Sequence, residues 1–134
     1  MAPAPDYDVA IIGGGLAGLS LAVRLAAQPR LRTVVIEPRT AYRRDRTWSY
    51  WRLHDHPFAE AVTARWTAWE VRRPGPAGTP LVAAQTCPAL PYETIPADRL
   101  YRLATDRLDA APGVTRLAGV VADAVVERAD RVEI

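Results

Sequence analysis

The sequence contains no lysine, a single cysteine and only two histidines. The cysteine, Cys87, cannot form an internal disulfide or a cysteine-ligated metal cluster by itself, and it favours a reducing, cytoplasmic setting. All seventeen basic residues are arginines, set against fifteen acidic residues, and the net charge of +2 gives no indication of nucleic-acid binding. We therefore predict no metal site and no nucleic-acid partner.

Long hydrophobic runs are also missing. The apolar run at residues 9–12 is too short, and too closely followed by glycine, to span a membrane. The residues before it carry no basic stretch of the kind that opens a secretory signal. We expect a protein that is neither secreted nor membrane-spanning, and whose membrane contact, if it has any, is peripheral.

What the sequence does contain is an ordinary globular composition, with 49% hydrophobic and 24% charged residues among 134. This length fits one modest domain with a real core. It is short for a complete nucleotide-dependent enzyme. We therefore expect the chain to be one part of a larger catalytic unit.

Four of the eight glycines lie in one segment, residues 13–18. A buried strand is predicted at 7–12 and a helix rich in leucine and alanine at 16–27. In the pattern G-x-G-x-x-G, the first glycine permits a tight turn, the second lets the backbone approach a pyrophosphate, and the third permits close packing of helix on strand. The predicted cofactor-binding residues of this segment are Gly13, Gly14, Gly15, Leu16, Ala17 and Gly18.

The next predicted strand, 33–37, ends in Glu37, roughly 20 residues beyond Gly18. A carboxylate at this place can accept hydrogen bonds from the hydroxyls of an adenosine ribose, and its charge repels a 2′-phosphate. This context favours nucleotide binding over a purely structural turn. Arg39 is a further predicted cofactor contact, whereas the arginines within residues 43–46 are expected on a solvated loop.

The remaining pattern predicts an α/β, Rossmann-like fold in which helices cover an incomplete parallel sheet. A cluster of proline and glycine at 73–80 marks a hairpin turn. The further predicted elements are a loop at 39–52, a helix at 58–69, hairpin arms near 69–71 and 81–83, a helix over 96–109, a third parallel strand at 114–117, and an antiparallel ribbon formed by 120–127 and 131–134.

Other residues that often carry chemistry receive no catalytic role. Cys87 is expected to be a small buried apolar residue, because no histidine lies near it in the sequence. His54 and His56 are expected on the surface. Asp98 suits the first turn of a helix, and Glu93 is expected to face solvent. The sequence therefore predicts no catalytic residue in this chain.

The segment 8–37 resembles the FAD-binding fold of the glutathione-reductase and aromatic-hydroxylase superfamily. Residues 45–51 look like the Thr-Trp segment that follows the second strand in bacterial lycopene cyclases, and residues 92–95 are similar to the next recurring block of that family. The sequence departs from the family at 43–46, where many members have Gly-Gly-Asn-His. Trp48, within the Thr-Trp segment, is expected either to line a flavin or substrate channel or simply to be buried.

The resemblance implies an enzyme that cyclises the linear ends of lycopene into β-ionone rings, a non-redox isomerisation. It also implies reduced FAD, which stabilises positive charge on the substrate, and NAD(P)H as the electron source. The family's catalytic acids, substrate domain and second FAD-binding segment lie outside this chain. Residues 1–134 are therefore expected to be the N-terminal part of a FAD/NAD(P)-binding domain, inactive by itself. The alternatives are a fragment of a flavin-dependent monooxygenase or reductase, or a non-catalytic nucleotide-binding module.

Overall fold

The computed structural model describes residues 5–134. In this part of the chain, β1 (Val9–Ile12), β2 (Thr33–Glu37) and β8 (Val114–Ala118) form a parallel sheet in the order β1-β2-β8. Every residue of β2 is buried, because a strand lies on each side of it and both of its faces are covered. The three predicted parallel strands are confirmed. The prediction that the chain carries no secretory signal depends partly on residues 1–4. These residues lie outside the described residues.

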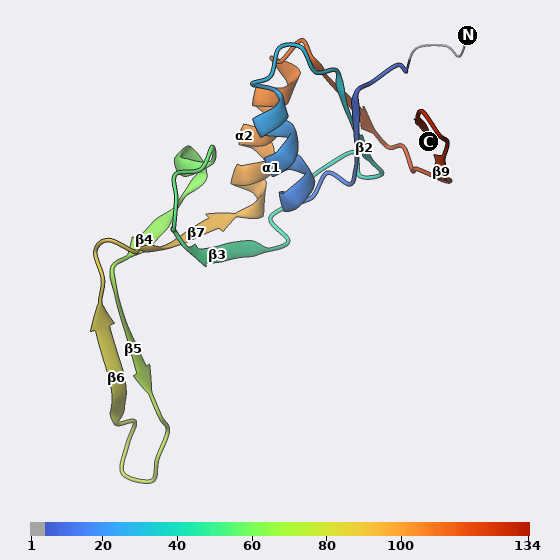
Figure 1. Cartoon of the computed structure of the whole chain (residues 1–134). Coiled ribbons are helices and arrows are strands. Elements are labelled where there is room, and N and C mark those ends of the chain that lie inside the picture. Colours follow the sequence, from blue (N-terminus) through green and yellow to red (C-terminus); the bar gives the residue numbers. More distant parts are fainter. Residues whose placement is uncertain (1–4) are drawn as a thin grey trace.

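Two helices pack side by side over one face of this sheet (Figure 1). They are α1 (Leu16–Leu25) and α2 (Ala97–Asp109), and both were predicted within two residues at either end. Leu19 of α1 and Leu100 and Leu108 of α2 are fully buried in the core that they share with the sheet. Burial of these leucines stabilises the α/β layer. No helix within residues 5–134 combines the length and apolar character needed to cross a bilayer.

A second, antiparallel sheet has the order β3-β7-β4 and lies beyond the ends of the helices (Figure 1). Its strands are β3 (Thr47–Trp51), β7 (Tyr92–Pro96) and β4 (Ala64–Trp66). The predicted loop at 39–52 is therefore wrong for residues 47–51. Alternate residues of β3 turn inward, and pairing with β7 supplies the hydrogen bonds that a loop would lack.

The predicted helix at 58–69 is also wrong. It is replaced by the single turn η1 (Ala59–Ala61), by β4, and by the start of β5 (Ala68–Arg72). The apolar spacing that suggested a helix is compatible with either structure over so short a stretch. Pairing of β4 with β7 satisfies the backbone in the extended conformation and so decides between them.

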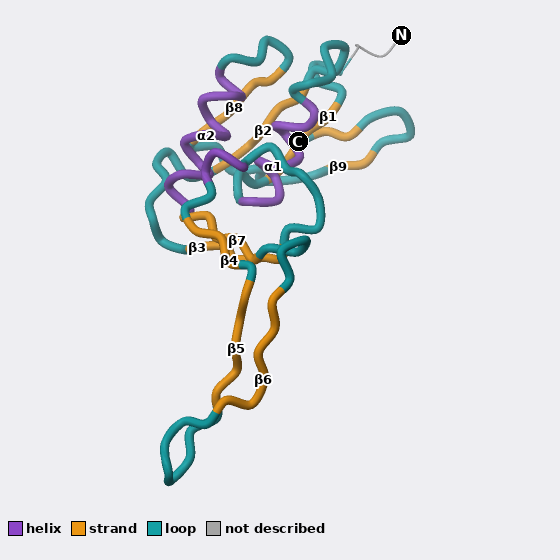
Figure 2. Tube along the Cα trace, turned by 90° about the vertical axis from the view of Figure 1, so that its left-hand side faces the viewer, coloured by secondary structure: helices purple, strands orange, loops and turns teal. Residues whose placement is uncertain are grey.

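The strand β5 pairs with β6 (Leu81–Thr86) in a hairpin that runs away from the rest of the molecule (Figure 2). The predicted hairpin is thus confirmed, with longer arms. All residues of both strands are exposed. Since a two-stranded ribbon is marginally stable by itself, this hairpin adds little to the stability of the core.

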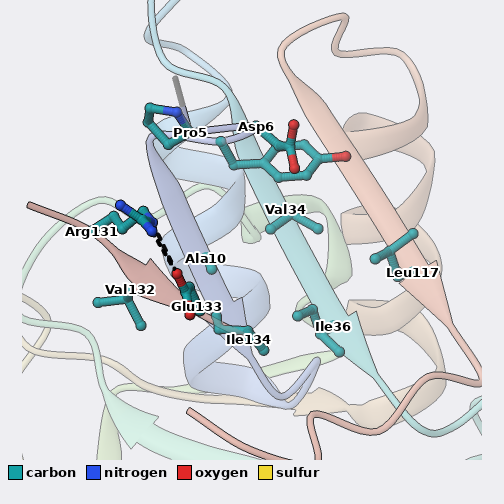
Figure 3. A pocket seen from close by; sticks show the side chains of 11 residues that line it. Pro5, Asp6, Ala10, Val34, Ile36, Leu117, Arg131, Val132, Glu133 and Ile134 are labelled. Atoms are coloured by element: carbon teal, nitrogen blue, oxygen red, sulfur yellow. Dashed lines mark hydrogen bonds and ion pairs between the residues drawn. The ribbon is translucent and has the colours of Figure 1, made fainter. Parts of the chain in front are cut away.

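The face of the parallel sheet opposite the helices meets a short ribbon of β9 (Val126–Glu127) and β10 (Val132–Glu133). Figure 3 shows Val34 and Ile36 of the sheet beside a cavity of about 390 Å³ that residues 131–134 also line. The predicted ribbon is confirmed, although residues 120–125 are irregular. The fold class is α/β with a Rossmann-like parallel sheet, as predicted.

Candidate cofactor site

The glycine loop joins β1 to α1 in a conformation that requires glycine at two of its positions. Gly13 has a φ of +104°, which side chains with a Cβ rarely adopt. A Cβ on Gly18 would lie 1.9 Å from the carbonyl oxygen of Gly13, so the helix packs against the loop at backbone distance. By contrast, a Cβ on Gly15 would meet no atom of the described residues within 4 Å. The surface at Gly15 is therefore open to a ligand.

The N-terminus of α1 opens onto the same surface. Gly15 is its N-cap residue, and within residues 5–134 no side chain caps this end. The first turn, which begins with Leu16 and Ala17, contains no acidic residue. Backbone N–H groups at such an end, together with the helix dipole, favour an anionic ligand. These residues fit the diphosphate of a dinucleotide.

Glu37 lies at the end of β2, where it is only 6% exposed, and holds the glycine loop. Its Oε2 atom accepts a hydrogen bond of 2.5 Å from the Gly14 N–H. Its Oε1 atom accepts one of 2.7 Å from Arg39 Nε. Hydrogen bonding by Arg39 lowers the pKa of Glu37 to about 2, against the opposing effect of burial. The predicted acid therefore lies beside the predicted loop and is ionised at neutral pH.

Arg39 is held between Glu37 and two aromatic rings. Its guanidinium carbon lies 4.8 Å from the centre of the Tyr42 ring and 5.4 Å from that of the Tyr101 ring. One of its nitrogens also approaches the Gly14 carbonyl oxygen at 3.4 Å. The structure thus brings Arg39 together with Glu37 and the glycine loop.

Tyr42 is a part of this site that sequence reasoning missed. Its hydroxyl donates a hydrogen bond of 3.2 Å to the Gly14 carbonyl, and a Cβ on Gly14 would lie 2.6 Å from its oxygen. Its ring stacks on Tyr101 with centroids 4.1 Å apart. The only available signal was an aromatic residue shortly after the acid at the end of β2. The arginines within residues 43–46 are exposed, in agreement with a solvated loop.

A second buried carboxylate corrects two predictions. Glu93 was expected to face solvent, but it is 0% exposed, because β7 lies between β3 and β4. It accepts hydrogen bonds from Arg65 Nε at 2.7 Å, and its Oε2 lies 3.2 Å from His56 Nε2. His56 was expected on the surface, yet its side chain is only 16% exposed. Burial acts to raise the pKa of Glu93, but these hydrogen bonds hold it below its ordinary value.

The remaining predicted positions are simpler. His54 is exposed and Asp98 lies in the first turn of α2, both as expected. Cys87 is half-buried and not fully buried. Trp48 is half-buried and meets Tyr101 edge-on, with centroids 5.6 Å apart. Within residues 5–134, no three His, Cys, Asp or Glu side chains come together as metal ligands would.

Comparison with known proteins identifies the family of this chain. The family model for lycopene cyclase protein matches residues 8–134. The chain belongs to the lycopene cyclase family. Together with the open glycine loop, membership of this family indicates that the chain is a flavin-binding segment.

Solved structures show the same fold as this member of the lycopene cyclase family. PqsL from Pseudomonas aeruginosa, described as a probable FAD-dependent monooxygenase, is 22% identical with a TM-score of 0.72, and the match covers 92% of this chain and 36% of PqsL. The p-nitrophenol 4-monooxygenase PnpA from Pseudomonas putida DLL-E4 is 17% identical with a TM-score of 0.71, over 92% of this chain and 34% of PnpA. The chain thus spans about a third of each structure.

A sequence relative covers a smaller region. The glucose–methanol–choline oxidoreductase AtC of Aspergillus terreus is 52% identical over 40 residues, which are 30% of this chain and 7% of that protein. AtC is therefore similar to this chain over a short segment only.

Proposed function

We propose that residues 8–134 bind FAD as the N-terminal part of an enzyme that cyclises the linear ends of lycopene into β-ionone rings. The observation that carries this proposal is the hydrogen bond between the glycine loop, at the Gly14 N–H, and Glu37, in a chain of the lycopene cyclase family. The domain to which these residues contribute is a FAD/NAD(P)-binding domain, and its substrate region lies outside them.

The proposed roles follow from the site. The N–H groups at the start of α1, from Leu16 and Ala17, hold the diphosphate. Glu37 accepts hydrogen bonds from the ribose hydroxyls and repels a 2′-phosphate, which favours FAD over a phosphorylated dinucleotide. Arg39 and Tyr42 border the adenosine end of the site. Reduced flavin, with electrons from NAD(P)H, supplies negative charge that stabilises positive charge on the substrate.

Ring closure begins with protonation of a terminal double bond, and Glu37 is not the acid. With a pKa of about 2 it is fully ionised at neutral pH and has no proton to give. We therefore assign no catalytic residue to this chain and propose that it has no cyclase activity alone. Because lycopene is a hydrocarbon that partitions into lipid, the whole enzyme is proposed to contact a membrane peripherally.

Flavin binding is tested by titrating the purified chain with FAD and following the flavin absorbance and fluorescence. We expect weak but measurable binding, which Glu37→Ala weakens about tenfold by removing the ribose acceptor. Cys87→Ala is the matched control, because Cys87 lies away from the glycine loop. Equal effects of the two substitutions would remove the role assigned to Glu37.

Cyclisation is tested by supplying lycopene, without oxygen and with a reductant, to a polypeptide that carries these residues together with any residues encoded beyond Ile134. We expect ring formation without net oxidation. A flavin-dependent monooxygenase is the second candidate, since the fold is shared with PqsL and PnpA. That candidate predicts oxygen consumption and an oxidised product instead. A chain that binds a nucleotide and supports neither reaction would be a non-catalytic binding module.

A further inference from the structure

The Glu37 carboxylate already has a full set of hydrogen-bond donors. Its Oε1 atom accepts hydrogen bonds from the Arg39 backbone N–H at 3.0 Å and from Arg39 Nε at 2.7 Å. Its Oε2 atom accepts them from the Gly14 N–H at 2.5 Å and from Arg39 Nη2 at 3.2 Å. An ionised carboxylate has about four acceptor positions. The hydroxyls of a ribose can therefore reach Glu37 only by displacing donors that it already has.

These donors differ in how easily they can leave. The Gly14 and Arg39 N–H groups belong to the backbone, and the fold fixes their positions beside the carboxylate. The other donors belong to the Arg39 side chain, which is 37% exposed. The further polar contacts of this side chain, with the Tyr101 hydroxyl and the Gly14 carbonyl oxygen, are both 3.4 Å long. Glu37 can thus release the guanidinium of Arg39 while it keeps both backbone donors.

A vicinal diol matches the positions that the guanidinium occupies. The Nε–H and Nη2–H groups of Arg39 donate side by side, one to each oxygen of Glu37. The 2′- and 3′-hydroxyls of a ribose are also a pair of neighbouring donors, so the exchange leaves neither carboxylate oxygen short of a partner. With a sugar that lacks these hydroxyls, the same exchange would leave a buried anion with its backbone donors alone. Such a sugar should leave Arg39 in place.

We propose that the Arg39 guanidinium occupies the ribose position of the free protein and is exchanged for the 2′,3′-diol of the bound nucleotide. This inference rests on the proposed function and adds to it a residue that determines which sugars can reach Glu37. The guanidinium carbon lies 4.8 Å from the centre of the Tyr42 ring and 5.4 Å from that of the Tyr101 ring. These aromatic faces attract the cation independently of Glu37, which lowers the cost of its release.

The exchange can be followed on Arg39 itself. The 134-residue chain is labelled with ¹⁵N, and the ¹H–¹⁵N signal of Arg39 Nε is assigned by its absence from Arg39→Met. Because Glu37 holds this N–H, we expect it to be protected from exchange with water in the free chain. ADP should shift the signal and abolish its protection. 2′,3′-Dideoxy-ADP, which carries the same diphosphate without the diol, should leave both unchanged.

Affinity supplies an independent measurement. Isothermal titration gives the ratio of the affinity for ADP to that for 2′,3′-dideoxy-ADP, and the effect of diphosphate charge cancels from this ratio. Arg39→Met should raise the ratio about fivefold, because the diol no longer has to displace the guanidinium. Arg43→Met is the matched control. It removes an exposed arginine from the same segment and should leave the ratio unchanged.

Each result of these experiments decides the question. An Arg39 signal that responds to ADP alone, with a ratio that rises in Arg39→Met alone, supports the exchange. An unchanged signal with ADP bound, equal responses to the two nucleotides, or a ratio that stays the same or falls in Arg39→Met overturns it.

A parallel FAD titration, followed by flavin absorbance, separates this inference from the proposed function. A chain that binds neither FAD nor ADP overturns both. A chain that binds FAD while the Arg39 signal stays unchanged overturns the exchange alone and leaves the proposed function standing.

Discussion

Two buried carboxylates, Glu37 and Glu93, anchor the two halves of the molecule in different ways. Glu37 ends a parallel strand and holds a loop, and its main partner, Arg39, has a side chain that is 37% exposed. Glu93 lies inside an antiparallel strand and is enclosed by donors from β3, β4 and the segment between them. One carboxylate is next to an open surface, and the other has no access to solvent.

The difference indicates what each carboxylate can do. Glu37 can exchange a protein donor for a ligand hydroxyl, because its surroundings open toward the glycine loop. Glu93 cannot exchange one of its protein donors for a ligand without leaving a buried charge unpaired. Its hydrogen bonds therefore serve to hold β3, β4 and β7 together. We therefore expect substitutions near Glu93 to act on stability, and substitutions near Glu37 to act on cofactor binding as well.

The largest effect is expected from Glu93→Ala. It removes the acceptor of three donors and leaves the largely buried Tyr50 and His56 without that partner, which should lower the free energy of unfolding by about 3 kcal/mol. Urea unfolding followed by tryptophan fluorescence measures it. Glu70→Ala removes an exposed partner of Arg72 and should leave the midpoint unchanged. If Glu93→Ala were as stable as Glu70→Ala, Glu93 would not have the structural role that distinguishes it from Glu37.

Gly18→Ala should be the next most severe change, because its Cβ would collide with the Gly13 carbonyl. We expect a loss of about 2 kcal/mol in the free energy of unfolding and loss of FAD binding. Gly15→Ala has room for the methyl group and should spare stability while weakening FAD binding. Thermal unfolding with a parallel FAD titration distinguishes the pair, and equal destabilisation by both would contradict the assigned geometry.

The pH dependence of stability should reveal Glu37. Its pKa falls from the ordinary value of 4.5 to about 2 on folding, so the unfolded chain takes up the proton first. The stabilisation is complete above 4.5 and is lost as the pH falls toward 2. Urea midpoints measured across this range should decline less steeply in Glu37→Gln than in the unmodified chain. If the urea midpoints of the two proteins declined equally with falling pH, the pKa of Glu37 would not be lowered by folding as described.

The smallest effect is expected from Tyr42→Phe. Loss of the hydrogen bond to the Gly14 carbonyl should weaken ADP binding by about fivefold while leaving adenosine binding unchanged, because the hydroxyl orients the diphosphate loop. Isothermal titration with each ligand measures this. Tyr92→Phe is the control, since its hydroxyl makes no hydrogen bond to the other described residues. An equal loss for ADP and adenosine would indicate a general structural role instead.

The sequence by itself determined the parallel half of this protein. The strand at Val9, the glycines, the helix from Leu16 and the acid at Glu37 are read from neighbouring residues, since apolar periodicity and the steric needs of glycine act locally. The resemblance in residues 45–51 pointed to the family that the comparison then showed. These are features that short segments of chain can specify without reference to the rest.

Only the tertiary structure decided the antiparallel half. The burial of Glu93 and His56 and the extended form of residues 64–66 depend on strand pairing. The paired residues, from Thr47 with Pro96 to Trp66 with Tyr92, are far apart in the sequence. Likewise, the hydroxyl of Tyr42 reaches Gly14 only because β2 pairs with β1. Such contacts are set by register and packing, and register is fixed when whole elements assemble.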